Sequence, residues 1–227
     1  MLKAPPEDAA RLALDRALTQ AVRARLAAGQ RPTVGAGAIA LRGALKGLEP
    51  AEASPARAVL GRLDAASGPC LVVWGPASQV LGADRYGLAA RLAAKPEAAL
   101  KAVREGGRAL MDLTPSNAWF GRLLAEPGLR VVAALPDYGS GLPRALLVQT
   151  AQPGPTGDDR TFWATDSALP NSRIVDAMSD AGLVATPLIE AGGLKLFVLA
   201  GYVQAEDGRL NGAPGKLSGV IGAAPIF

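Results

Sequence analysis

The sequence predicts an α+β protein with an α/β part. It is divided into a three-helix segment over residues 1–66, an α/β layer over residues 67–152 and a ferredoxin-like unit over residues 153–227. Three observations carry this prediction. Apolar residues recur at helical spacing in the first segment, and short β-branched runs alternate with helical stretches in the second. The third segment reads strand, helix, strand, strand, which is the opening of a ferredoxin-like unit.

The first segment predicts three helices joined by short connections. Helix one follows Pro5 and Pro6, ends at Gly29 and carries apolar residues every four positions, namely Leu14, Leu18, Val22 and Leu26. A second helix is expected over residues 38–48, weakened by Gly43. The third is expected to begin with Ser54 as N-cap and Pro55 as the first helical residue.

The middle segment predicts alternating strands and helices in a largely parallel sheet. Strands are expected at residues 70–75, 108–113, 130–136 and 144–150, and helices at 86–94, 97–105 and 117–125. Cys70, which opens the apolar run CLVVW, is expected to be a small core residue rather than a nucleophile.

The last segment predicts a strand at residues 161–165, a turn over 169–172, a helix that closes at Gly182, and strands at 183–189 and 195–202. Residues 204–219 are too rich in Gly and Pro for a second helix. The ferredoxin-like unit is therefore expected to be reduced, with only its final strand at residues 220–227.

Composition excludes several classes of chemistry. The chain has 227 residues, no histidine and one cysteine, so no Ser/His/Asp or Cys/His relay, zinc cluster or disulfide can be built from it. No apolar run approaches the roughly 20 residues that span a bilayer, and no signal-like segment precedes the first helix, so we expect a cytoplasmic protein without a membrane partner.

Charge is unevenly distributed along the chain. Residues 1–66 hold ten Lys and Arg against six Asp and Glu, whereas residues 67–227 hold fourteen of each. The first segment has no Phe, Trp or Tyr, and its basic residues are not clustered, so nucleic acid is not the expected partner. A small anionic ligand fits this charge better, and a solvated basic surface is the alternative.

The stretch LALDRALTQAVRARL resembles the first helix of the all-helical chorismate mutases, through Leu14, Asp15, Leu18, Val22 and Arg25. The order of the whole chain is similar to that of longer chorismate mutase and prephenate dehydratase proteins with an ACT-like end. The resemblance implies rearrangement of chorismate to prephenate in a homodimer, without cofactor or metal. It implies a catalytic Arg25, and Arg31, Arg42 and Lys46 are the substitutes available to bind an aromatic-pathway dianion.

The chain departs from that family at several positions. Asp8 stands where the family has an arginine, and Ala36 and Gly37 stand where it has a lysine. The dehydratase motif Thr-Arg-Phe is replaced by Arg160, Thr161 and Phe162, so dehydratase activity is not carried over. The mutase activity is therefore expected to be weak or lost.

Three turns are candidates for small-ligand binding. The turns over residues 75–78 and 114–117 place N–H groups and hydroxyls where a helix is expected to begin. The third, over residues 169–172, resembles the turn that borders the amino-acid pocket in ACT domains. Their candidate effector-binding residues are Ser78, Ser116, Asn171 and Ser172. The plain alternative is that these residues are only helix caps. Two further functions remain open: a non-catalytic protein that binds an aromatic amino acid or prephenate, and an α/β protein whose first helices serve only to dimerise it.

Overall fold

The computed structural model describes residues 8, 9, 12, 13, 16, 19, 20, 22, 23, 34–87, 90–139 and 141–227. The chain divides into two units, Met1–Arg31 and Pro32–Phe227. In the first unit the described residues from Ala9 to Arg23 are helical, as the apolar spacing predicts. The remainder of this section concerns the second unit.

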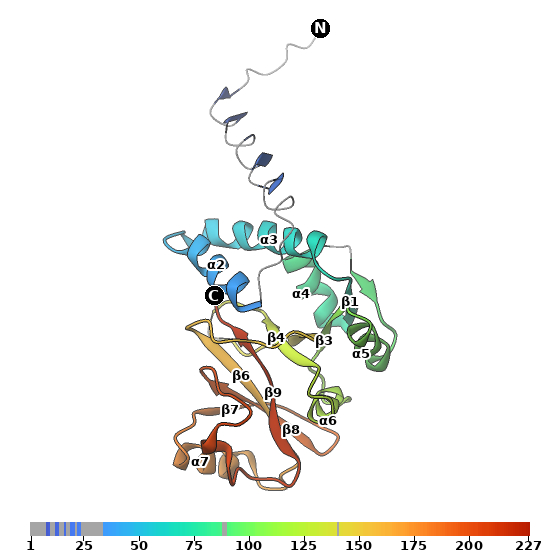
Figure 1. Ribbon diagram of the computed structural model, residues 1–227, viewed down its shortest axis with the longest axis vertical. Helices are drawn as coiled ribbons and strands as arrows, with labels where there is room; N and C mark the ends of the chain where they lie inside the picture. Colours follow the sequence, from blue (N-terminus) through green and yellow to red (C-terminus); the bar gives the residue numbers. More distant parts are fainter. Residues whose placement is uncertain are drawn as a thin grey trace. The chain divides into compact units, whose positions relative to one another are not determined.

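Nine strands of the second unit form one mixed sheet in the order β2-β1-β3-β5-β4-β9-β6-β8-β7 (Figure 1). Their bounds are β1 Leu71–Trp74, β2 Arg91–Leu92, β3 Arg108–Asp112, β4 Arg130–Leu135, β5 Ala145–Gln149, β6 Asp159–Thr165, β7 Ala185–Ala191, β8 Leu194–Ala200 and β9 Ser218–Pro225. The pairs β1–β2, β1–β3 and β4–β9 are parallel, and the other neighbouring pairs are antiparallel. The expectation of a largely parallel sheet is therefore wrong.

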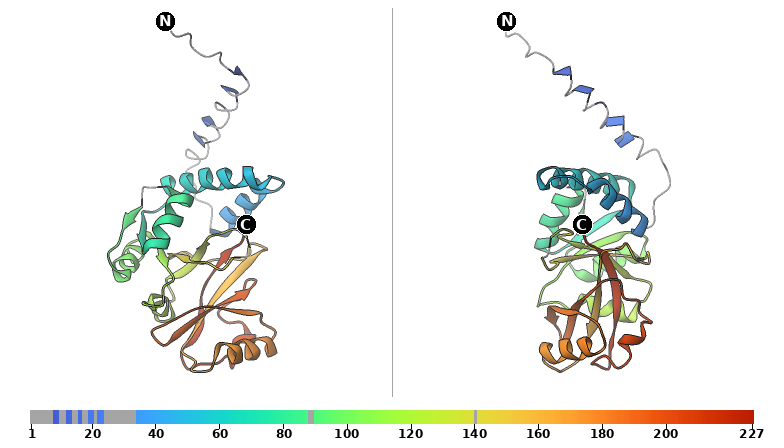
Figure 2. Two further views of the ribbon diagram at one scale, coloured as in Figure 1. Left: turned by 180° about the vertical axis from the view of Figure 1, so that it is seen from behind. Right: turned by 90° about the vertical axis from the view of Figure 1, so that its left-hand side faces the viewer.

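The helices of this unit are α2 Val34–Leu45, α3 Pro50–Ser67, α4 Pro76–Tyr86, α5 Pro96–Arg104, α6 Arg122–Ala125 and α7 Asn171–Asp180, with 3-10 turns at Trp119–Gly121 and Gly208–Leu210. Figures 1 and 2 show α2 and α3 at one end of the sheet and α7 at the other. No helix in the described part of the chain is long and apolar enough to cross a membrane.

One hydrophobic core runs through most of the sheet. It joins Val72 and Met111 of the first strands, Leu100 of α5, and Phe162 and Leu196 of the last strands. Two smaller clusters lie elsewhere, one that includes strand residues Val73 and Leu110 and one that includes residues of α7. Strand β9 joins the first five strands to the last three, because it pairs with β4 on one side and β6 on the other.

The predicted fold class is wrong because of this shared sheet and core. The strand, helix, strand, strand order of the last segment is confirmed by β6, α7, β7 and β8. These elements are not a free-standing ferredoxin-like unit, however, since their sheet continues through β9 into β4. Nor is the beginning a separate helical domain, because α3 packs against α4.

Several elements begin or end elsewhere than predicted. Helix α3 starts after the N-cap Glu49, whose backbone N–H donates to Glu52, so Pro55 lies inside the helix rather than at its start. Residues 86–94 are not a helix, because α4 ends at Tyr86 and Arg91–Leu92 form β2. Cys70 precedes the first strand residue and is exposed, which contradicts the expected core position.

Candidate functional site

A hollow of about 640 Å³ lies where the parallel strands β1 and β3 end, and we call it the strand-end hollow. Its lining comes from the end of β1 and the turn into α4, from the end of β3, from the residues before β5, and from β7. Ligands in open α/β sheets bind preferentially outside the carboxyl ends of parallel strands. The topology of the first strands thus makes this edge a candidate site.

Asp112, the last residue of β3, occupies the amino end of α4. Its carboxylate accepts hydrogen bonds from the backbone N–H groups of Ala77, at 2.9 Å, and of Ser78. Gly75 is required at this approach, because its φ is +95° and a Cβ there would overlap the Asp112 carboxyl group. The positive end of the α4 dipole therefore meets a negative charge supplied by the protein itself.

Arg144 brings a positive charge to the same hollow. Its backbone is fixed by hydrogen bonds to Leu135 and Leu113, at 2.8 and 2.9 Å, which hold the start of β5 against β4 and β3. Its exposed guanidinium makes no ion pair with any residue that the structure describes. Since the Asp112 charge already faces the helix dipole and two N–H donors, Arg144 is the free charge of this site.

The remaining lining combines hydroxyl groups with apolar walls. The Oγ atoms of Thr114 and Ser116 lie 2.9 Å apart and form a hydrogen bond. The apolar walls are Trp74, Leu113, Pro143, Leu188 and Ile189. Few polar groups on a mostly apolar surface are typical of pockets that orient a small organic ligand.

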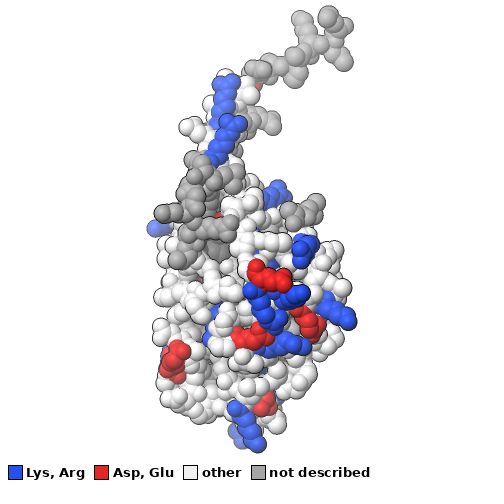
Figure 3. Space-filling view, turned by 45° about the vertical axis from the view of Figure 1, so that its right-hand side comes forward, with Lys and Arg blue, Asp and Glu red and all other residues white. Residues whose placement is uncertain are grey.

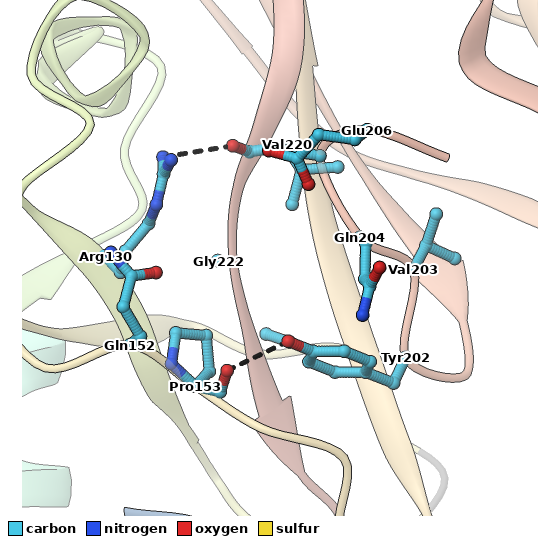
Figure 4. A pocket seen from close by; sticks show the side chains of 11 residues that line it. Arg130, Gln152, Pro153, Tyr202, Val203, Gln204, Glu206, Val220 and Gly222 are labelled. Atoms are coloured by element: carbon cyan, nitrogen blue, oxygen red, sulfur yellow. Dashed lines mark hydrogen bonds between the residues drawn. The ribbon is translucent and has the colours of Figure 1, made fainter. Parts of the chain in front are cut away.

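A second hollow, of about 280 Å³, lies over the β4–β9 seam and is lined by Arg130, Gln152, Tyr202, Gln204 and Glu206 among others (Figure 4). Two of these side chains already bond to the protein backbone. Arg130 donates to the Val220 carbonyl at 3.3 Å, and Tyr202 donates to the Pro153 carbonyl at 2.9 Å. Its polar groups thus fasten strand ends and loops together, so this hollow is a weaker candidate.

The structure describes two of the four basic residues that were predicted to clamp a dianion. Arg25 and Arg31 lie outside the described residues. Arg42 on α2 donates to the carbonyl oxygens of Thr156, Asp158 and Ile226, so its guanidinium ties α2 to the loop before β6 and to the end of the chain. Lys46 is exposed just after α2.

The predicted effector-binding residues fall in two places. Ser116 lines the strand-end hollow, together with the turn that precedes Ser78. Ser78 itself is fully buried, and its Oγ atom has no hydrogen-bond partner. Asn171 and Ser172 begin α7 and line neither hollow. The structure therefore brings together two of the three predicted turns and leaves the third apart.

Sequence reasoning missed Asp112 and Arg144. Asp112 closes the run RALMD, and a polar residue at the end of a buried strand is a signal that could have marked it. Arg144 stands directly before the run ALLVQ, and no local pattern distinguishes it from other surface arginines. Its significance depends on the antiparallel pairing of β5 with β3, which the sequence did not indicate.

One face of the molecule carries charges of both signs. On the face that Figure 3 shows, Lys and Arg side chains are interspersed with Asp and Glu. Ion pairs link Arg104 to Glu126 at 2.7 Å and Arg122 to Glu97 at 3.1 Å, which connects α5 with α6 and the residue that follows it. This face presents alternating charges rather than a uniformly basic surface.

Comparison with known proteins gives little guidance. No protein-family model matches the sequence, and no curated protein matches it either. Among solved structures, the chain is similar to GqqA, described as a novel type of quorum quenching acylase. The TM-score is 0.47 at 15% identity, over 70% of this chain and 95% of that one. A likeness at this level assigns no function.

The resemblance to the chorismate mutase family is wrong. No family model supports it, and the chain is not all-helical but carries a nine-stranded sheet. The expectations that depended on this resemblance are wrong as well. These are the rearrangement of chorismate, a role in aromatic amino-acid biosynthesis, and the ACT-like recognition of an aromatic amino acid or prephenate.

Proposed function

We propose that the protein binds a small carboxylate-bearing compound in the strand-end hollow. The observation that carries this proposal is Arg144, which lines the hollow and whose guanidinium forms no ion pair with any described residue. A guanidinium presents paired N–H donors that match a carboxylate bidentately, and such charge-assisted bonds are among the strongest in proteins.

The other walls support a ligand with an apolar body. Trp74, Leu188 and Ile189 offer contact area, and the hydroxyls of Thr114 and Ser116 offer a hydrogen bond to a second polar group. The volume of about 640 Å³ lies within the range of about 300–1,000 Å³ typical of small-molecule pockets.

Binding, rather than catalysis, is the function that this lining supports. The Asp112 carboxylate already accepts two backbone N–H bonds, and the two hydroxyls bond to each other. Among the described lining residues, no carboxylate or amine forms a hydrogen bond with either hydroxyl, as a general base would.

Tryptophan fluorescence tests the proposal, because Trp74 lines the hollow whereas Trp119 and Trp163 are buried. We expect cyclohexanecarboxylate to change the emission with a Kd of about 1 mM, and the neutral cyclohexanecarboxamide to bind far more weakly. The signal should vanish in Trp74→Phe. Arg144→Met should weaken binding at least about tenfold, equivalent to about 1.4 kcal/mol.

The matched control is Arg173→Met, which removes an exposed arginine of α7 that does not line the hollow. This variant should bind like the wild type. Equal affinity in wild type and Arg144→Met, or no response to the acid at tens of millimolar, would reject the proposed site.

A further inference from the structure

Arg160, the second residue of β6, is a buried cation. Only 5% of its surface is exposed. Its Nη1 donates to the Gly141 carbonyl oxygen at 3.2 Å, whereas its Nε is buried with no hydrogen-bond partner. Buried polar groups nearly always have partners, so an unpartnered donor on a charged side chain calls for an explanation.

Among the residues that the structure describes, none forms an ion pair with this guanidinium. The neighbouring Asp159 carboxylate is occupied by Thr156, through its backbone N–H and its hydroxyl, both at 2.7 Å. Burial lowers the pKa of Arg160, and only the nearby charge of the exposed Asp158 opposes this effect. Among the described residues, no carboxylate forms an ion pair with Arg160.

Arg160 lines a hollow of about 260 Å³, which we call the Arg160 hollow. Strand pairing places Arg160 opposite Ala200, and the positions two residues further along each strand pair Phe162 with Val198. The side chains at these positions therefore share one face of the sheet. Its apolar walls are Leu142, Val184, Val198 and Ile226, and the acidic residues Asp158 and Asp159 also line it.

Two of these apolar walls are unusually open to solvent. Val184 is 71% exposed and Leu142 is 45% exposed, and both line the hollow together with the buried Arg160. A buried charge costs several kcal/mol unless it is paired, and exposed apolar side chains gain by being covered. One ligand with an anionic head and an apolar chain satisfies both requirements.

We propose that the Arg160 hollow is a second binding site, for a monocarboxylate with a short apolar chain. The carboxylate accepts hydrogen bonds from Arg160, and the chain covers Val184 and Leu142. The volume corresponds to roughly nine water molecules at about 30 Å³ each, which suits an acid of roughly four to six carbons. This site is distinct from the strand-end hollow and does not depend on Arg144.

Calorimetric titration with hexanoate tests this proposal on the full chain. We expect binding with a Kd of about 1 mM, and no detectable binding of hexanamide, which has the same chain without the charge. Arg160→Met keeps much of the side-chain volume and should weaken hexanoate binding at least tenfold. These titrations are made with Arg144→Met present throughout, so that the strand-end hollow does not contribute. Arg173→Met, which removes an exposed arginine of α7 that does not line the Arg160 hollow, should leave the affinity unchanged within about twofold.

A surface variant guards against a folding defect in Arg160→Met. Val184→Asp places a carboxylate at an exposed position that lines the same hollow, so it should weaken hexanoate binding at least tenfold in a folded protein. Unchanged affinity in Val184→Asp, equal binding of hexanamide, or absence of binding by the parent protein with Arg144→Met would each overturn the proposal. Hexanoate binding that the wild type shows but Arg144→Met loses would assign it to the strand-end hollow instead.

Discussion

Replacing Asp112 by alanine tests how the strand-end hollow is organised. The variant removes the carboxylate that accepts N–H bonds from Ala77 and Ser78 at the start of α4. It leaves in place the bond from the Trp119 indole, because that bond, at 2.7 Å, goes to the backbone oxygen of residue 112. The perturbation is thus confined to the end of one helix.

The expected loss follows from two terms. Leaving the buried N–H of Ser78 without an acceptor costs about 1–3 kcal/mol, and losing the negative charge at the helix end costs about 0.3–1 kcal/mol. We therefore expect Asp112→Ala to lower the free energy of unfolding by about 3 kcal/mol, or the Tm by about 6–12 °C for a domain of this size. Asp112→Asn keeps one acceptor and should lose roughly half as much.

Urea unfolding followed by circular dichroism measures this loss, and added formate tests its cause. Formate can accept hydrogen bonds from the N–H groups that Asp112→Ala leaves without an acceptor. It should therefore reduce the difference in free energy of unfolding between the variant and the protein that keeps Asp112. Chloride at equal ionic strength should not reduce this difference. Both proteins should carry Arg144→Met, so that the guanidinium does not contribute. A loss below about 1 kcal/mol, or no selective effect of formate, would refute the assigned role of Asp112.

Two further variants test the framework around the sites. Asp137→Asn leaves the buried guanidinium groups of Arg57 and Arg85 without their shared carboxylate, so urea unfolding should show a loss of about 3–5 kcal/mol; a loss near zero would mean that this ion pair is dispensable. Gly222→Ala should cost roughly 3 kcal/mol in thermal or urea unfolding, because φ is +144° and a Cβ would overlap the backbone of β4. Gly128→Ala, which meets nothing within 4 Å, is its control and should stay within about 0.5 kcal/mol of the wild type.

Local patterns identified most strands, because short apolar runs with β-branched residues are strong signals. The runs that became β1, β4 and β5 were expected nearly where they lie. The body of helix α4 was missed, although a helix start was expected at the turn before Ser78, because its signals are weak along the sequence. Gly75 and Pro76 read as a turn, and the acceptor for the first N–H groups is Asp112, 34 residues beyond Ser78. A remote cap leaves no mark in the local sequence.

The sheet crosses one of the predicted boundaries for a similar reason. The predicted boundary near residue 152 falls in a segment rich in Gly and Pro, which is the usual composition of a linker. Whether such a segment separates two domains depends on the partners of the strands on either side. Strand β9 comes from the end of the chain and pairs with β4 as well as β6, so one sheet spans the boundary.

The candidate sites depend on how charges are paired, which a charge count does not reveal. Residues 67–227 contain equal numbers of basic and acidic residues. The charge count therefore predicted an anion site in the basic first segment instead. Pairing within the fold is uneven, however. Asp137 serves both Arg57 and Arg85, and burial together with Arg85 lowers the pKa of Arg57.

Other carboxylates are committed to the backbone rather than to cations. Asp112 faces the amino end of α4, and Asp159 faces Thr156. A carboxylate used in this way is not shared with an arginine. Arg144 and Arg160 form no ion pair with any described residue, and each lines a hollow with apolar walls. Both sites proposed for small acids therefore lie in a segment whose formal charge is zero.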